Sequence, residues 1–255
     1  MEMLRVEDLF RYFGGLQVLQ GLSFNVASGE RLAIIGPNGA GKTTLFNVLG
    51  GQLSATTGRV YLMGQDITAL APQRRLHLGL ARSFQLNNLF FNLTLIDNIL
   101  LALKGADLPH FQMFRPLSKR TDLFATAENL LRSMGLWEMR SVPLTNLSYG
   151  DQRLVEVAFA LASRPKLLML DEPSAGLSTA EAAAFADTIR NLLGDTTLIF
   201  CAHDMDLVFT LADRIAVLYF GQIIAQGTPQ EIQANPRVKE IYLGSEETTE
   251  NAGSK

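Results

Sequence analysis

The chain has 255 residues, which is enough for one large α/β domain or for a core with a small subdomain. Hydrophobic residues make up 47% of the chain and charged residues 18%, a composition that excludes an intrinsically disordered protein. The net charge of -3 lacks the basic surplus of a typical nucleic-acid binder, so we expect no nucleic-acid partner.

The sequence predicts a protein that is soluble by itself. Its start, MEMLRVEDLF, intersperses charged and apolar residues, so we expect no signal peptide. No apolar run reaches the length of about 20 residues that spans a bilayer, and Asp97 and Asn98 interrupt the stretch LTLIDNILLAL. The one cysteine, Cys201, cannot form an internal disulfide, which fits a reducing compartment.

The N-terminal part predicts two strands joined by an exposed tip. Residues 4–9 alternate loosely in polarity, RYFGG follows as a loop tip, and residues 22–26 predict an edge strand. A ring at the tip, Phe13 or Tyr12, would be placed to stack on a nucleotide base. The alternative is a packing role, which is common for aromatic residues beside turns.

The stretch GPNGAGKTT lies between an apolar run at residues 32–35 and an apolar helical pattern at residues 45–49. Strand, glycine-rich turn and helix form the context of a phosphate-binding P-loop, and the pattern G-x-x-x-x-G-K-[ST] is met. Lys42 adds a full charge for the β- and γ-phosphates, and Thr43 offers a hydroxyl to Mg²⁺. The flanking elements disfavour the alternative, a glycine-rich turn with a chance lysine. The predicted triphosphate-binding residues of the loop are Gly36, Pro37, Asn38, Gly39, Ala40, Gly41, Lys42, Thr43 and Thr44.

The next part of the chain alternates between strand and helix signals. Residues 59–63 predict a strand, residues 72–78 a short helix, and residues 81–85 a strand that runs into a polar loop. The spacing alone gives Gln85, at the end of this strand, no more than a surface position.

Two helices follow, with an irregular segment between them. Residues 94–103 predict a helix with Thr94 as its N-cap, and residues 122–134 predict a second helix that Gly135 ends. Residues 104–120 contain prolines, phenylalanines and cations. They form either an ordered surface insertion or a surface that docks a partner.

The sequence LSYGDQR precedes another helix, whose apolar positions recur at helical spacing from Asp151 onward. Ser148 and Gly150 therefore lie at a helix N-terminus, where backbone N–H groups can bind an anion. The alternative is an ordinary N-cap, the usual role of a serine before a helix.

Residues 167–170 form a continuous apolar run, which is typical of a buried parallel strand, and Asp171 and Glu172 follow it directly. Two carboxylates at this position are costly unless a cation or proton chemistry occupies them. Because neighbours on an extended backbone point in opposite directions, we expect Asp171 to face Mg²⁺ and Glu172 to reach the attacking water. The alternative is a surface Asp-Glu pair at a strand end.

Residues 179–193 predict a long helix, and residues 196–201 predict another apolar strand, shortly before His203. Ligands of open α/β sheets bind at the carboxyl edge of the strands, so His203 would share this edge with the P-loop. The alternative is a loop histidine held by hydrogen bonds.

The C-terminal part predicts a last strand pair at residues 214–219 and 222–225, followed by a short helix at residues 229–233. The end of the chain is polar, and we expect it to be mobile.

In this order, from about residue 4 to residue 244, the motifs resemble those of the ATP-binding subunit of ABC transporters. GPNGAGKTT resembles Walker A, LSYGD the signature, LLMLDEP Walker B and SAGLS the D-loop. The resemblance implies an α/β fold: a P-loop NTPase (RecA-like) core with a mainly parallel sheet, an N-terminal antiparallel β subdomain and an α-helical subdomain. It also implies a single ABC ATP-binding domain at residues 1–244, with the helical subdomain at about 86–160, and a flexible polar tail at residues 245–255.

The resemblance also assigns roles that spacing leaves open. It identifies Phe13 as the adenine-stacking aromatic of the A-loop, Gln85 as the ATP-binding glutamine of the Q-loop, and His203 as the switch histidine that holds the γ-phosphate. The implied ligands of Mg²⁺ are Thr43, Gln85 and Asp171. The implied catalytic residues are Lys42, Glu172 as general base, and His203.

Hydrolysis in such a family takes place between two subunits, so the resemblance implies a shared site. Walker A of one subunit and the signature of the other would enclose each nucleotide, so ATP closes a dimer and hydrolysis reopens it. The signature residues acting in trans would be Ser148, Tyr149, Gly150 and Asp151. Tyr149 and Asp151 replace the Gly and Gln of the common LSGGQ, and Ser178 stands where many members have Asp or Asn. These departures concern coupling between the two sites rather than ATP binding.

A finer resemblance is to the branched-chain amino-acid import ATPases, which FGGL, LSYG, SAGL and the ending NPRVKEIYLG all support. ATPases for urea import and for lipopolysaccharide export are the alternatives. The resemblance implies ATP and Mg²⁺ as cofactors. The implied partners are a second ATP-binding subunit in a homo- or heterodimer, two transmembrane permease subunits and an external solute-binding protein. The chain would bind peripherally at the cytoplasmic face of the plasma (inner) membrane, with Gln85 and the segment to about Leu101 at the permease contact.

Two other classes of protein share parts of this pattern. Non-transport ABC ATPases that act on nucleic acid or ribosomes usually carry two cassettes or long coiled-coil insertions, and this sequence shows neither. Small-molecule P-loop kinases share the phosphate loop, but the signature motif argues against that class.

Overall fold

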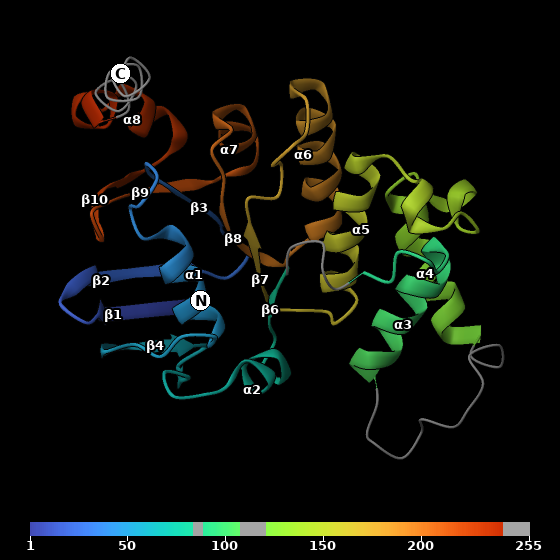
Figure 1. Cartoon of the computed structure of the whole chain (residues 1–255), viewed down its shortest axis with the longest axis horizontal. Helices are drawn as coiled ribbons and strands as arrows, with labels where there is room; N and C mark the ends of the chain where they lie inside the picture. Colours follow the sequence, from blue (N-terminus) through green and yellow to red (C-terminus); the bar gives the residue numbers. More distant parts are fainter. Residues whose placement is uncertain (84–88, 108–120, 242–255) are drawn as a thin grey trace.

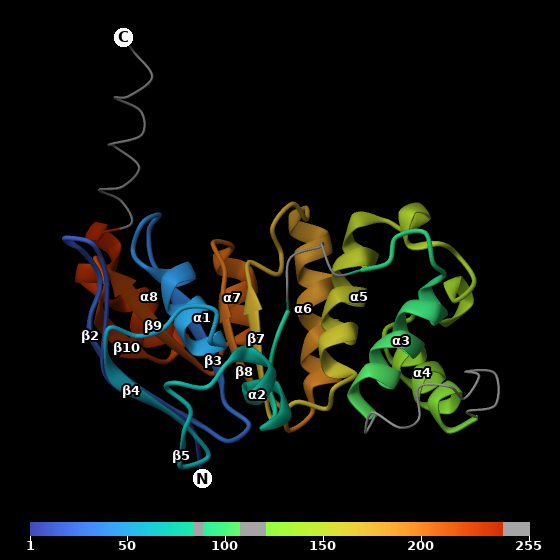
Figure 2. The ribbon, with the colours of Figure 1, turned by 60° about the horizontal axis from the view of Figure 1, so that its bottom comes forward.

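The computed structural model describes residues 1–83, 89–107 and 121–241. An antiparallel sheet lies at one end of the molecule, a larger and mainly parallel sheet lies in the middle, and helices α3 (Leu95–Asp107) and α4 (Thr121–Ser133) lie at the other end (Figures 1 and 2). The implied α/β fold is therefore confirmed. Gln85, most of the irregular segment 104–120 and the polar tail 245–255 lie outside the described residues.

The antiparallel sheet has the order β2-β1-β4-β5. Its strands are β1 (Glu2–Phe13), β2 (Leu16–Ala27), β4 (Thr57–Leu62) and β5 (Gln65–Asp66). The first two strands are longer than the alternation predicts, because their pairing continues to Phe13 and Leu16 on either side of a tight turn at Gly14. β2 lies at the sheet's edge, as predicted, and the two-residue β5 was not predicted.

The second sheet has the order β10-β9-β3-β8-β7-β6 within the described residues. Its strands are β3 (Arg31–Ile35), β6 (Leu80–Arg82), β7 (Leu167–Asp171), β8 (Thr197–Cys201), β9 (Arg214–Tyr219) and β10 (Gln222–Gly227). All neighbouring pairs are parallel except β9 and β10, which form an antiparallel hairpin. The continuous apolar runs of β3, β7 and β8 are buried, as expected for strands covered on both faces.

Helices cover the parallel sheet on both faces. α1 (Lys42–Gly50) packs between the two sheets with its apolar side chains in a core that includes residues of β1, β2 and β4. α6 (Thr179–Leu193) and α7 (Met205–Leu211) cover the opposite face. The other helices are α2 (Pro72–His77), α5 (Tyr149–Leu161) and α8 (Pro229–Ala234), with 3-10 turns at Trp137–Met139 and Leu144–Asn146.

A third apolar core joins α3, α4 and α5 and extends from Leu89 to Ala162. It lies within the part of the chain for which a helical subdomain was predicted, although the predicted limits themselves stay a prediction. Thr94 Oγ1 accepts a hydrogen bond from Asp97 N, which agrees with its predicted N-cap role. α3 continues to Asp107, four residues past the predicted end at residue 103. No helix in the described ranges combines the length and apolar character needed to cross a membrane.

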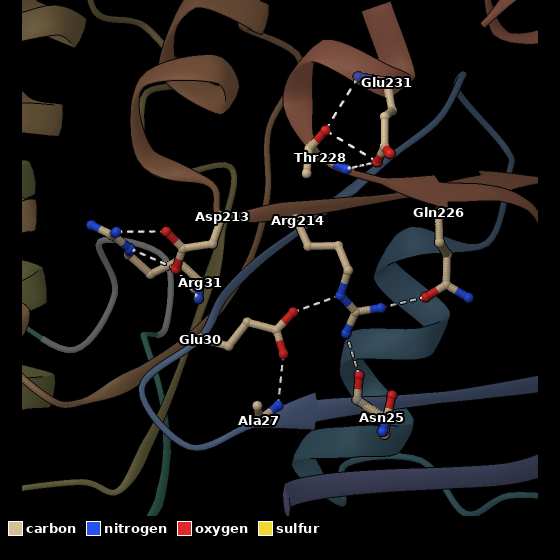
Figure 3. A network of polar contacts seen from close by, with 9 residues as sticks. All are labelled: Asn25, Ala27, Glu30, Arg31, Asp213, Arg214, Gln226, Thr228 and Glu231. Atoms are coloured by element: carbon tan, nitrogen blue, oxygen red, sulfur yellow. Dashed lines mark hydrogen bonds and ion pairs between the residues drawn. The ribbon is translucent and has the colours of Figure 1, made fainter.

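A polar network connects the amino-terminal ends of β3 and β9 with β2 and β10 (Figure 3). The Arg214 guanidinium binds Glu30 Oε1 at 2.6 Å, Gln226 Oε1 at 2.6 Å and Asn25 O at 2.5 Å. The Arg31 guanidinium forms two hydrogen bonds with the Asp213 carboxylate, at 2.6 and 3.0 Å. Because β3 begins at Arg31, this network joins the two sheets at the edge opposite the P-loop.

Candidate functional site

The P-loop connects the end of β3 to the first residue of α1, Lys42, as the sequence predicts. Gly39 and Gly41 have φ values of 78° and 106°, a region that favours glycine. A Cβ on Gly36 would lie 2.0 Å from Leu218 O, and one on Gly41 would lie 3.0 Å from Val18 O. The loop can therefore keep this shape only with these glycines, and Asn38, Gly39 and Thr43 remain exposed on its open side.

Contacts from β2 and from the β9–β10 turn hold the loop from outside. Gly221 N, in the turn, donates to Ala40 O at 2.9 Å, and Gln20 N donates to Gly221 O at 2.9 Å. A Cβ on Gly221 would approach Val18 O to 2.3 Å, so these three segments pack backbone against backbone. Such a loop is ordered before any ligand binds, which lowers the entropic cost of binding.

Lys42 lies on the inner side of this loop and is only 7% exposed. Its Nζ donates to Gly36 O at 2.6 Å and to Pro37 O at 3.1 Å. Burial lowers the Lys42 pKa below its usual value, and the charges of Glu172 and Asp171 partly oppose this effect. A phosphate group on the loop would supply the buried ammonium with a negative partner.

The opposite end of α1 is fixed by a buried arginine. Arg75 Nη1 donates to Val48 O at 2.8 Å and to Leu49 O at 2.6 Å, and Arg75 is only 2% exposed. Burial lowers the Arg75 pKa to about 10. A cation at the carbonyl end of a helix is favourable, so Arg75 helps to hold the helix that carries the P-loop.

The parallel strands bring the predicted carboxylates to the same edge as the P-loop. Cys201, the last residue of β8, pairs with Ile34 of β3 on one side and with Asp171 of β7 on the other. Glu172 N donates to Cys201 O at 2.9 Å, so the backbone pairing of β7 with β8 extends one residue past Asp171. The P-loop, Asp171 and Glu172 therefore lie at one edge of the sheet.

Arg82, at the end of β6, was not predicted to be part of this site. Its Nη2 donates to Asp171 Oδ2 at 2.8 Å, and its Nη1 donates to Asn47 Oδ1 at 2.7 Å. The other carboxylate oxygen, Asp171 Oδ1, accepts from Cys201 Sγ at 2.8 Å. Burial and the nearby Asp171 raise the Cys201 pKa above its usual value, so this thiol stays protonated. The position of Arg82 on the strand beside β7 was the available signal for its contact with Asp171.

The extended backbone assumed for Glu172 is wrong. Glu172 has a φ of 50°, in the left-handed region, so its side chain leaves the strand in a direction that simple alternation does not predict. A residue other than glycine in this region costs about 1–3 kcal/mol, and such strain gathers at functional sites. The turn brings Glu172 Oε1 to 3.0 Å from His203 Nε2. The predicted proximity of His203 to this edge is thereby confirmed, and its side chain is 54% exposed.

Ser148 lies at the N-terminus of α5, as predicted, and within its own subunit it is the N-cap that was the alternative interpretation. Its Oγ accepts from Asp151 N at 3.1 Å and donates to Asp151 Oδ2 at 2.7 Å. Ser148 and Tyr149 are both exposed, and α5 lies on the other side of β7 from α1 (Figures 1 and 2). These residues therefore face solvent instead of their own P-loop.

Phe13 ends β1 and is 43% exposed. The Arg11 guanidinium lies 4.5 Å from its ring centroid. Phe13 pairs with Leu16, and Val18, two residues further along β2, has its carbonyl against Gly41. The hairpin tip thus belongs to the same surface region as the P-loop, and the stacking role of Phe13 stays a prediction.

A groove of about 570 Å³ separates the parallel sheet from the helical part. It is lined by residues that follow α1 and by residues of α2, β6, α3 and α5, among them Leu89, Phe90 and Leu101. None of the P-loop residues lines it. The groove is therefore separate from the phosphate site, and it includes part of the segment where the sequence predicts a permease contact.

The donor set at the sheet edge restricts which metal could bind. In the described part of the chain, no group of three or more His, Cys, Asp or Glu side chains is arranged to hold a metal ion. A hydroxyl and one carboxylate, Thr43 and Asp171, suit Mg²⁺ that also keeps water and phosphate oxygens as ligands. Among the described residues, this donor set therefore fits a magnesium–nucleotide complex.

Comparison with known families gives two matches. The family model described as ABC transporter matches residues 19–175. The model described as branched-chain amino acid ATP-binding cassette transporter matches residues 222–248.

Individual relatives are similar along nearly the whole chain. The high-affinity branched-chain amino acid transport ATP-binding protein LivG of Salmonella typhimurium is 39% identical over 255 residues, covering 95% of this chain and 98% of LivG. A probable branched-chain amino acid transport ATP-binding protein LivG of Methanocaldococcus jannaschii is 34% identical over 252 residues, covering 96% of this chain and 98% of its own length.

Solved structures agree with the fold. The ADP conformation of an ATP-binding cassette from an ABC transporter superposes with a TM-score of 0.85 at 32% identity, covering 96% of this chain and 99% of the other. A nucleotide-free ATP-binding cassette gives a TM-score of 0.83 at 32% identity, covering 95% of this chain and 99% of the other.

Proposed function

The chain belongs to the ATP-binding family of ABC transporters, and we propose from this that it powers the import of branched-chain or other small amino acids. The proposed substrate class rests on the match of residues 222–248 to the family model of branched-chain amino acid ATP-binding cassette transporters. The identity of 39% to a branched-chain amino acid transport ATPase adds support.

The phosphates would bind on the open side of the P-loop. Its N–H groups, the N-terminus of α1 and the Lys42 ammonium would all meet the same anion. Lys42 would exchange its carbonyl partners, Gly36 O and Pro37 O, for phosphate oxygens. Phe13 would stack on the adenine from the hairpin tip.

Thr43, Asp171 and Gln85 would hold Mg²⁺, although Gln85 lies outside the described residues. Bound there, the ion would neutralise charge on the β- and γ-phosphates. Arg82 would have to share Asp171 with it, because its Nη2 lies 2.8 Å from Asp171 Oδ2.

Glu172 and His203 would carry the chemistry of hydrolysis. Glu172 would accept a proton from water as the water oxygen bonds to the γ-phosphorus and the bond to the β-phosphate oxygen breaks, which leaves ADP and phosphate. His203 would turn from Glu172 Oε1 to the γ-phosphate, a movement that its exposed position permits. Lys42 and the loop N–H groups would stabilise the charge that develops on the phosphoryl oxygens.

The nucleotide site would be completed by a second subunit, either a copy of this chain or a related one. Ser148, Gly150 and the N-terminus of α5 are exposed or half-exposed and would contact the γ-phosphate bound to the partner. Since only the closed dimer makes this second set of phosphate contacts, ATP would favour closure and hydrolysis would favour opening.

Energy would pass to permease subunits through the groove between the sheet and the helical part. Its lining is largely apolar and includes Leu76, Leu101 and Phe159. The polar residues in the lining are Gln52, Gln73, Arg82, Ser83, Glu156 and Ser163. A short helix of a permease subunit, with apolar residues on one face, would fit such a surface. The chain would then be peripheral to the cytoplasmic face of the membrane, and an external solute-binding protein would deliver the cargo.

The test is co-purification from membranes followed by uptake measurements with leucine, isoleucine, valine and urea. We expect recovery with membrane subunits, and ATP-dependent uptake of the branched-chain amino acids in vesicles containing the purified complex. Uptake of urea alone would refute the proposed substrate. RNase-sensitive recovery without membrane subunits would instead indicate a non-transport ATPase.

A further inference from the structure

Tyr149, one of the two signature residues that depart from the common motif, is held by its own helix. Arg153 Nη2 donates to Tyr149 Oη at 2.7 Å, and the guanidinium carbon lies 5.1 Å from the centre of the tyrosine ring. The two residues are four apart on α5, so they lie on one face of the helix. Tyr149 is nevertheless 38% exposed, so this arrangement lies at the surface where α5 begins.

Tyr149 also lies against the segment Ser174–Ser178, identified above as the D-loop. Gly176 in this segment has a φ of 85°, and a Cβ there would come 2.9 Å from Tyr149 Cε1. Arg153 Nη2 additionally donates to Ala175 O at 3.4 Å. The tyrosine ring and the arginine thus join the start of α5 to the D-loop of the same subunit, and the absence of a side chain at Gly176 makes room for the ring.

Arg153 is anchored deeper in the protein by Glu156. The two form an ion pair of 2.9 Å, and their side chains are 10% and 8% exposed. Arg153 Nε and Glu156 Oε1 are buried without a hydrogen-bond partner among the described residues. A buried ion pair that leaves polar atoms unsatisfied is weak evidence for a stabilising role.

The position of this pair connects two regions of the proposed site. Glu156 and Ser83 line both the groove and a small cavity of about 10 Å³, and Arg153 and Asp171 also border the cavity. The pair therefore lies in the wall between the proposed permease surface and the edge that carries Asp171. Arg153 thus borders this wall and also contacts Tyr149 and Ala175.

We propose that Tyr149 and Arg153 are positioning residues that hold the signature and the D-loop of one subunit as a single unit during ATP-driven closure of the dimer. The inference rests on the proposed function, because the signature acts only on a nucleotide bound to the partner. In this role Tyr149 orients Ser148 and Gly150 relative to the D-loop before the partner arrives. Glu156 holds Arg153 in the orientation that lets it contact both Tyr149 and Ala175.

The experiment uses Glu172→Gln as the parent protein, so that ATP is bound without turnover, and adds Tyr149→Phe to it. The phenylalanine keeps the ring on Gly176 and removes only the hydroxyl that Arg153 binds. Sedimentation measures dimer formation at saturating ATP and Mg²⁺, calorimetry measures nucleotide binding by the dilute monomer, and thermal unfolding measures stability. Tyr61→Phe is the matched control. Tyr61 lies on the remote strand β4, and the guanidinium carbon of Arg5 lies 4.3 Å from the centre of its ring.

We expect Tyr149→Phe to weaken ATP-driven dimerisation about tenfold to a hundredfold, the scale of one hydrogen bond to a charged group. Nucleotide binding by the monomer and the melting temperature should stay close to those of the parent and of the control. Arg153→Lys keeps a positive charge beside Glu156 but loses the planar guanidinium that contacts Tyr149 and Ala175. It should weaken dimerisation to a similar extent.

Equal dimerisation of the parent and Tyr149→Phe would overturn the positioning role. An equal loss of stability, monomer binding and dimerisation would overturn it too, because it would show a purely structural contact. A parent that stays monomeric at saturating ATP would overturn the shared site of the proposed function itself, and the inference with it. That result is distinct from the other two, since it needs no change at Tyr149.

Discussion

Replacing Gly221 by alanine tests whether the β9–β10 turn holds the P-loop in shape. Gly221 has a φ of 74°, a conformation that costs an L-residue about 1–2 kcal/mol. The new Cβ would also lie 2.3 Å from Val18 O, and because that atom belongs to the backbone, a segment must move. Such overpacking adds about 1–3 kcal/mol. Movement of the turn would disturb the bond from Gly221 N to Ala40 O in the loop.

Gly64→Ala is the matched control. Gly64 has a φ of 81°, and a Cβ there would meet nothing within 4 Å. Gly64→Ala should lower the free energy of unfolding only by the backbone contribution of about 1–2 kcal/mol. Gly221→Ala should lower it by about 2–5 kcal/mol in total. At this chain length each kcal/mol lowers the melting temperature by about 2–4 °C.

Calorimetric unfolding and titration with ATP measure the two effects separately. We expect Gly221→Ala to bind ATP more weakly than the wild type and Gly64→Ala to bind it equally well. Equal melting temperatures and equal ATP affinities of the two variants would refute the view that the turn supports the loop.

Three further predictions concern single side chains. Lys42→Ala should lower ATP affinity by between about tenfold and a hundredfold, the scale of a lost charged contact; unchanged affinity in a titration would contradict the phosphate assignment. Glu172→Gln should keep ATP binding, stop hydrolysis and accumulate an ATP-bound dimer; full turnover in a phosphate-release assay would exclude Glu172 as the base. Burial tends to raise the Asp213 pKa, but hydrogen bonds from Arg31 outweigh this effect and lower it below its usual value. The contribution of Asp213 to stability is therefore present above pH of about 4 and is lost as the pH falls through the lowered pKa. Urea unfolding should show a smaller loss of stability between neutral and acid pH in Asp213→Asn than in the wild type, and equal losses would contradict the role of this pair.

The parts of the site that lie close together in sequence could be predicted from sequence. The P-loop shows this, because a strand, glycines and a helix start within a few residues fix its shape. The placement of Asp171 and His203 beside it was predictable for a related reason. Buried parallel strands end at one edge, so two apolar runs were enough to bring their following residues together.

The rest depends on contacts between distant segments. Nothing near Gly221 in the sequence indicates that Val18 and Ala40 contact it, and the ring of Tyr149 on Gly176 is equally remote. The left-handed backbone of Glu172 was missed because alternation assumes that a strand simply continues. Helix α7 was missed because it is short, although Asp204, whose carboxylate caps Asp206 N and Leu207 N, was a recognisable start signal.

Cys201 gives the chain a built-in chemical reporter. It is the one cysteine in the sequence, its side chain is only 1% exposed, and its protonated thiol donates to Asp171. A buried thiol of raised pKa offers alkylating reagents neither access nor a useful fraction of thiolate. Labelling of the unmodified protein would therefore require the apolar core around Cys201, which includes side chains of α1, to open. The alkylation rate, measured with and without ATP, would show whether the nucleotide changes this opening, without any introduced cysteine.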